Sequence, residues 1–101
     1  MRMLVNVDFP VEPFNTYVKD GSIADRMHKV LGAIKPEAAY FSERNGHRGA
    51  TLIVDVKAAS DIPGLAEPFF LMFEADVEFR ICMTPEDLGS ANLGALGKQW
   101  A

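Results

Sequence analysis

Residues 38–57 read AAYFSERNGHRGATLIVDVK, and this stretch decides the fold. Its centre, Asn45-Gly46, is a pair that favours a two-residue type I′ turn, in which both residues have positive φ. Strand-forming residues flank the pair, so we predict a β-hairpin with arms at residues 38–44 and 47–57. The second arm is β-branched and mostly apolar on both faces, which is typical of a central strand.

Two other segments alternate with the period of a β-strand. In residues 3–9 the odd-numbered positions are all apolar, while two of the three even-numbered ones are polar. Residues 75–83 repeat this arrangement, with apolar odd-numbered positions and three charged residues among the four even-numbered ones. Successive side chains of a strand point to opposite faces, so each segment predicts a strand with one apolar face.

A helix in two pieces is predicted between the first strand and the hairpin. Residues 12–19 form the first piece, and Ser22 is expected to cap the second, which ends before Pro36. Apolar residues of the second piece recur at helical spacing and form a single stripe. The stripe consists of Ile23, Met27, Val30, Leu31 and Ile34.

A second helix is predicted at about residues 60–73, with a kink at Pro68. Thr84 then begins a further helical segment, with proline at the first helical position and acidic residues in the first turn. The tail that follows is rich in glycine, yet it carries large apolar residues that favour docking onto another surface. These residues are Leu88, Leu93, Leu96 and Trp100.

The predicted order of elements is therefore β-α-β-β-α-β followed by an arm at about residues 85–101. Right-handed crossovers turn this order into an α+β ferredoxin-like fold, with a four-stranded antiparallel sheet and both helices on one of its faces. The other face stays open. We predict one domain over residues 1–101, and, because 49% of the residues are hydrophobic, a homodimer or a larger homo-oligomer that covers the excess apolar surface.

Composition argues against several classes of partner. The formal net charge is -4 and the ten Lys and Arg residues are scattered, so nucleic acid is not an expected partner. No apolar run is long enough for a membrane span, and Asn6 and Asp8 interrupt the N-terminal segment before a signal-peptide core could form. The single cysteine, Cys82, excludes an intrachain disulfide and any multi-cysteine metal site. A cytoplasmic location is expected.

The stretch from His47 to Leu88 carries a family resemblance. With RGATLIVD at residues 48–55 and DVEFRICMTP at residues 76–85, it resembles small bacterial-type families of unknown function in the dimeric α/β-barrel superfamily. As a pattern of elements the resemblance covers nearly the whole chain. It implies that two ferredoxin-like sheets pack open face to open face. The superfamily includes cofactor-free monooxygenases, lactone isomerases, haem-degrading enzymes and ligand-binding regulatory domains, so the fold does not select one activity.

Polar side chains on the predicted open face are the first candidates for a site. We expect Asn6, Asp8, Glu78 and Arg80 to bind an anionic ligand, with Asp8 and Arg80 also candidates for catalysis. The alternative is that these charges pair across the dimer interface or lie in water at the rim of the barrel.

Histidine and tyrosine residues supply the remaining candidates. His28 and Tyr40 are candidate catalytic residues, because an imidazole titrates near neutral pH and a phenol can donate to a ligand oxygen. Each has a plainer alternative, which is a helix-edge position for His28 and interface or core packing for Tyr40 and Tyr17. His47 is expected to be an exposed turn residue. No metal site and no cofactor are expected.

Two hypotheses for the function follow. In the first, a dimer binds a small organic ligand, anionic or aromatic, and acts as a ligand-binding module or as a cofactor-free enzyme such as a monooxygenase or isomerase. In the second, the chain is a non-catalytic oligomerisation domain whose open face only joins subunits. An enclosed and partly apolar cavity with charged side chains in its wall would favour the first hypothesis.

Overall fold

Four antiparallel strands form a single sheet in the order β2-β3-β1-β4. The computed structural model describes all 101 residues of the chain. The central strands, β3 and β1, pair through seven residues, from Arg2 opposite Asp55 to Asp8 opposite Gly49. The bounds of the strands are β1 (Arg2–Asp8), β2 (Ala38–Arg44), β3 (His47–Asp55) and β4 (Asp76–Ile81).

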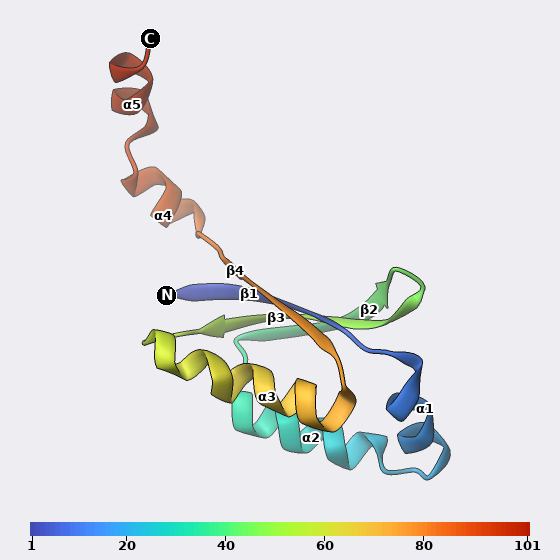
Figure 1. Cartoon of the computed structure of the whole chain (residues 1–101). Coiled ribbons are helices and arrows are strands. Elements are labelled where there is room, and N and C mark those ends of the chain that lie inside the picture. Colours follow the sequence, from blue (N-terminus) through green and yellow to red (C-terminus); the bar gives the residue numbers. More distant parts are fainter.

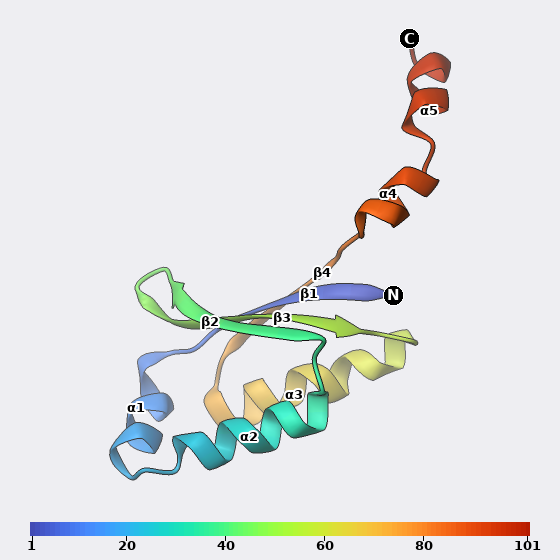
Figure 2. The same cartoon turned by 180° about the vertical axis from the view of Figure 1, so that it is seen from behind.

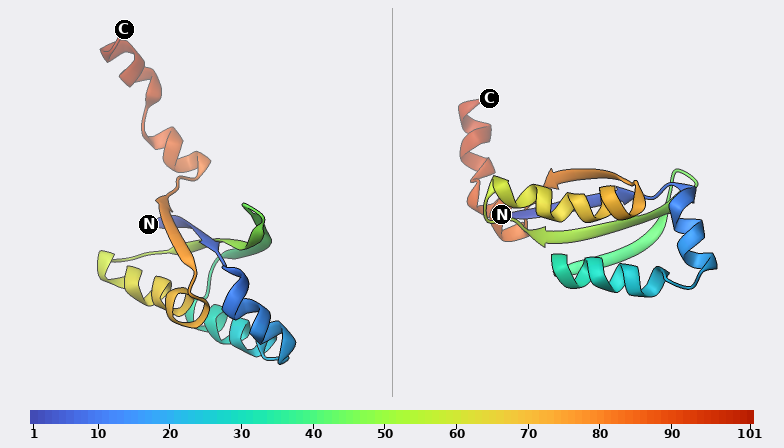
Figure 3. Two further views of the ribbon diagram at one scale, coloured as in Figure 1. Left: turned by 45° about the vertical axis from the view of Figure 1, so that its right-hand side comes forward. Right: turned by 60° about the horizontal axis from the view of Figure 1, so that its bottom comes forward.

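The helices before the last strand cover only one face of this sheet (Figure 1). Seen from behind in Figure 2, the C-terminal helices rise on the other side of the sheet and away from the domain. The right-hand view of Figure 3, in which the helix-covered face is turned forward, shows α3 and α2 running along the sheet in front of the strands. The helices are α1 (Val11–Lys19), α2 (Ile23–Ile34), the short 3-10 turn η1 (Ala59–Asp61), α3 (Ile62–Phe73), α4 (Pro85–Ser90) and α5 (Leu93–Gln99).

The order of elements and the order of strands confirm the predicted α+β ferredoxin-like fold. The hairpin is also confirmed. Asn45 and Gly46 connect β2 to β3 with φ values of 54° and 79°, as a primed two-residue turn requires. β3 lies between β2 and β1, so the strand that is apolar on both faces is a central one.

The core lies between the sheet and the helices, and the alternation along β1 builds its centre. Val5 and Val7 are almost fully buried, as is Phe9 just beyond the strand. Aromatic rings fill the end of the core next to α1, where the ring centroid of Phe73 lies 5.0 Å from that of Phe9 and 5.6 Å from that of Phe14. Such edge and tilted contacts add to the burial of apolar area.

Some boundaries and caps differ from the sequence prediction. Ser22 has helical φ/ψ and makes no capping bond; its hydroxyl accepts instead from Nε of Arg26 at 2.9 Å. The Asp20 carboxylate accepts the Ser22 amide at 2.8 Å, so a turn from the preceding residues replaces the predicted cap. α3 begins at Ile62, two residues later than predicted, and continues through Pro68, so the proline does not break the helix.

The last strand is shorter than predicted, since β4 ends at Ile81 and the chain then leaves the sheet. The start of α4 is as predicted. The hydroxyl of Thr84 accepts from the Asp87 amide at 3.1 Å, and the Asp87 carboxylate accepts from the Thr84 amide at 3.0 Å. The bonds from Thr84 hold the pKa of Asp87 below its usual value. No helix in the chain combines the length and the apolar character that crossing a membrane demands.

Phe73 should be the most sensitive core position that can be tested cleanly. Its side chain is 0% exposed, so Phe73→Ala leaves a cavity in the aromatic cluster and should lower the free energy of unfolding by about 3–5 kcal/mol. Leu71→Ala on the same helix is the matched control, because Leu71 is 80% exposed and its truncation should change stability by less than about 0.5 kcal/mol. Urea denaturation followed by circular dichroism measures both. Equal effects would contradict this account of the core.

Candidate functional site

The largest cavity of the chain is a groove of about 700 Å³ between the hairpin turn and α1. We call it the hairpin groove. Its volume falls within the range of roughly 300–1,000 Å³ that is typical of small-molecule sites. The residues that line it are Phe9, Val11, Phe14 and Asn15 on one side, and Phe41, Ser42, Glu43, Gly46, His47, Arg48 and Gly49 on the other.

Aromatic and aliphatic side chains form the apolar part of the hairpin groove. The Phe9 and Phe14 rings meet edge to face with centroids 5.2 Å apart. Phe9 also belongs to the buried core, which fixes its position at the groove. Val11 and Phe41 are each more than half exposed, although both are apolar and line the groove. The groove therefore offers uncovered apolar surface of a size that suits a flat ring.

Arg48 supplies a positive charge at this apolar surface. It precedes the buried Ala50 on the helix-facing side of β3. Its guanidinium carbon lies 4.5 Å from the centroid of the Phe14 ring, and Nη1 donates to Oδ1 of Asn15 at 2.8 Å. These neutral partners fix the side chain without cancelling its charge.

No carboxylate makes an ion pair with Arg48, although Glu43 lies opposite it in the register of β2 and β3. The four ion pairs of the chain involve Arg2, Arg44, Arg80 and the N-terminal amine. Arg48 is thus an oriented cation with free donors beside an apolar groove, an arrangement that suits a carboxylate or another oxyanion.

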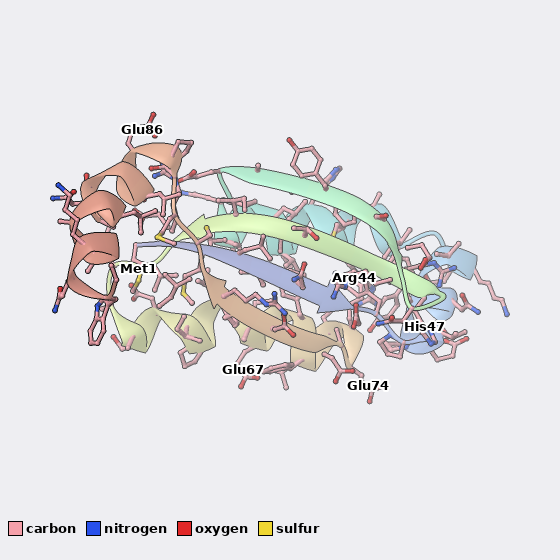
Figure 4. All side chains as sticks on the ribbon, turned by 90° about the horizontal axis from the view of Figure 1, so that it is seen from above. Met1, Arg44, His47, Glu67, Glu74 and Glu86 are labelled. Carbon is pink, nitrogen blue, oxygen red and sulfur yellow. The ribbon has the colours of Figure 1, made fainter.

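Two groups that can carry protons also line the hairpin groove. His47 is exposed, as the sequence predicts for a turn residue, and lies at the same end of the sheet as Arg44 (Figure 4). The Glu43 carboxylate accepts from the Gly46 amide at 3.3 Å across the turn. An imidazole and a carboxylate beside a bound ligand can accept or donate protons, which is the chemistry of general acid–base catalysis.

The predicted ligand-binding residues lie on the open face instead. β-pairing sets Asn6 opposite both Thr51 and Glu78, and Oδ1 of Asn6 accepts from the Thr51 hydroxyl at 2.9 Å. Arg80 donates from Nε to Glu78 at 2.8 Å, with the two side chains 70% and 54% exposed. Figure 4 looks onto this face, which no helix covers.

Asp8 lies apart from Arg80. Arg80 pairs with Leu4 in the register of β4 and β1, and Asp8 is four residues further along β1, about 13 Å away. The cation beside Asp8 is Arg44, whose Nε donates to the Asp8 carboxylate. Both side chains of this pair are only about a third exposed.

Gly49 makes the pair between Arg44 and Asp8 geometrically feasible. It lies on β3 directly opposite Asp8, and the Arg44 side chain crosses over it from β2. A Cβ at residue 49 would lie 2.5 Å from Cγ of Arg44. Sequence reasoning missed this contact, although a glycine inside a strand of β-branched residues often marks such a close approach.

The structure does not bring the four candidate catalytic residues together within one chain. His28 is exposed on α2, on the helix side of the sheet. Tyr40 is exposed on edge strand β2, while Arg80 is on the opposite edge strand β4. Tyr17 donates its hydroxyl proton to the Met72 carbonyl at 2.6 Å, so it ties α1 to α3. No three His, Cys, Asp or Glu side chains gather as a metal site would require.

Comparison with known proteins supports the fold. No protein-family model and no curated protein matches the chain. Among solved structures, the chain is similar to 5-chloro-2-hydroxyhydroquinone dehydrochlorinase (TftG) from Burkholderia phenoliruptrix AC1100, in complex with 2,5-dihydroxybenzoquinone. The TM-score is 0.56 at 16% identity, over 86% of this chain and 99% of that one.

This likeness is one of fold. It supports the α+β ferredoxin-like fold of this chain. It also provides an example in which this fold accommodates a small quinone ligand.

Gly49→Ala should break the contact between Arg44 and Asp8, because the new methyl group takes the space of the Arg44 stem. We expect the substitution to cost about 1 kcal/mol of unfolding free energy. Arg44→Ala should cost a similar amount alone and add little to Gly49→Ala, since both remove the same pair. A double-mutant cycle by urea denaturation measures this coupling.

Gly32→Ala is the matched control for that cycle. No atom lies within 4 Å of a Cβ built at Gly32, which is inside α2, so alanine there should stabilise the chain by about 0.5–1 kcal/mol. Fully additive costs for Gly49→Ala and Arg44→Ala would show that Gly49 does not serve the ion pair.

Proposed function

We propose that this protein is a homodimer that binds a small aromatic organic anion in the hairpin groove. The observation that carries the proposal is Arg48, a cation held by Phe14 and Asn15 with no carboxylate partner at the edge of an apolar groove. A ligand carboxylate or phenolate accepts hydrogen bonds from the free donors of Arg48. The ring of the ligand then covers the exposed side chains of Val11 and Phe41.

Energetics favour this class of ligand over a neutral or purely polar one. Arg48 is exposed, so an ion pair with it contributes about 0.2–1 kcal/mol, and about 1.5–3 kcal/mol where the ligand shields the charge-assisted hydrogen bond from water; burial of an aromatic ring adds about 1.5–3 kcal/mol. The quinone bound by the dehydrochlorinase of similar fold is a single small ring, as is the aromatic anion that we propose for the hairpin groove. That resemblance supports a small-molecule role for this chain.

An enzymatic activity is part of the proposal only at the level of proton transfer. His47 and Glu43 line the same groove as Arg48, and either can accept a proton from a bound phenol or carbon acid. This would suit a cofactor-free enzyme such as an isomerase or monooxygenase. A chain that binds no ligand in the groove would instead be a non-catalytic oligomerisation domain.

The open face is the second candidate location for the ligand. Asn6, Asp8, Glu78 and Arg80 are the residues that the sequence suggests for it, and in our proposal they face the partner chain. The strong exposure of Arg80 and Glu78 in a single chain fits either role. Substitutions on the two faces therefore distinguish the candidate sites.

Binding of a probe should depend on Arg48 and not on Arg80. We expect Arg48→Ala to weaken binding of salicylate or 2,5-dihydroxybenzoquinone by at least about tenfold, because a charge-assisted bond is lost. Arg48→Lys keeps the positive charge but lacks the planar guanidinium, so its affinity for the probe should lie between that of Arg48→Ala and that of the unaltered chain. Isothermal titration calorimetry measures the affinity of each probe for the dimer.

Arg80→Ala is the matched control, since it removes the same side chain from the other face of the sheet. Unchanged affinity of the probe for this variant supports the hairpin groove as the binding site. Loss of binding in Arg80→Ala with normal binding in Arg48→Ala would move the site to the open face. Absence of binding for both probes in the unaltered chain would favour the oligomerisation domain.

A further inference from the structure

The chain after β4 forms an arm that touches little of its own domain. Every residue from 85 to 101 is exposed, including both helices α4 and α5. The radius of gyration is 17.1 Å, against about 13 Å for a compact domain of this length. The longest axis of 60 Å, more than twice the next of 28 Å, reflects the same projection.

One side of the arm is apolar. Leu93 and Leu96 on α5 and Trp100 just after it follow each other at helical spacing and are 58%, 43% and 77% exposed. Leu88 on α4 adds another large apolar side chain to the arm and is 44% exposed. Three leucines and the only tryptophan of the chain are thus left in water by a single copy.

The helices of the arm are too short to be stable in isolation. α4 has six residues and α5 has seven, whereas an isolated helix needs roughly 12–15 residues to be even marginally stable. Gly89, Gly94 and Gly97 weaken them further. Packing against another surface must therefore supply the stability that the local sequence does not give these two helices.

The direction of the arm indicates where this surface lies. In Figures 1 and 2 the arm rises on the side of the sheet opposite α2 and α3, which is the side of the open face. In Figure 4 it stands at the end of the sheet near Met1 and leaves the strands uncovered. A body that covers the open face would therefore lie directly beside the arm.

We infer that the arm of each chain packs against a second copy of the chain that lies on the open face, with Trp100 as its anchor. Packed sheets are about 10 Å apart, and α5 alone spans about that length, so the arm reaches past the partner's sheet. A two-fold arrangement buries the arms of both copies in two equivalent contacts. This inference rests on the proposed homodimer and does not depend on the ligand.

Trp100 reports on this contact directly, because it is the only tryptophan. We expect its fluorescence emission to lie at short wavelength at concentrations where the full chain is dimeric. On dilution it should shift to long wavelength over the range in which sedimentation velocity shows dissociation. A dimer with the emission of an exposed tryptophan would overturn the inference, and so would short-wavelength emission from a monomer, which means the arm folds onto its own domain.

Leu96→Asp tests the same contact without relying on the tryptophan. A charge inside the apolar surface of the arm should raise the dimer Kd by at least about tenfold. Ala95→Asp is the matched control on the other side of α5, and it should change the Kd by less than about twofold, as expected for a rim charge. Far-UV circular dichroism shows whether each variant remains folded.

The possible failures differ in what they overturn. Equal Kd values for the two variants and the unaltered chain would remove the arm from the interface and leave the homodimer standing. A monomer at micromolar concentration would overturn both the homodimer and the role of the arm. Binding of salicylate to the hairpin groove can be measured in either case, so the ligand proposal is judged separately.

Discussion

Much of this structure depends on the alternation of side chains along β1. The strand is hydrogen bonded to β3 on one side and β4 on the other, so its two faces are the two faces of the sheet. Its apolar face, with Val5 and Val7, holds the helices through the core. Its other face carries Asn6 and Asp8, and no element of the same chain covers it. A shift of one residue in register would exchange these roles and expose the core.

Local signals in the sequence were enough to predict the elements and their order. Asn45-Gly46 fixes the hairpin turn, and the alternating segments fix which face of each strand is buried. The errors lie where local patterns compete. Ser22 resembles a helix cap in the sequence. In the structure its backbone amide donates to the Asp20 carboxylate, and Ser22 itself has helical φ/ψ. The end of β4 was overestimated because the alternation continues beyond the last pairing with β1.

The candidate site could be predicted only in part, because its contacts are long-range. Arg48 and Asn15 are 33 residues apart, and Arg44 and Asp8 are 36 residues apart. No local period connects such pairs. The charges on the open face follow from strand alternation, and they were located correctly on that face. Which of them meet depends on strand order and register, so the pairing of Asp8 with Arg44 rather than with Arg80 emerges only from the folded sheet.

The geometry separates ligand binding from assembly. The hairpin groove lies on the helix side of the sheet at the end next to α1, whereas the arm and the open face lie on the other side, with the arm at the opposite end. Only the sheet connects the two regions, and the ion pair between Arg44 and Asp8 stands on the open face directly behind the groove. A partner chain on that face would exclude water from this pair, and the cost of desolvating both charges would offset the stronger attraction between them. Substitutions at Arg48 on the helix side and substitutions in the arm therefore act on different regions of the molecule and can be tested independently.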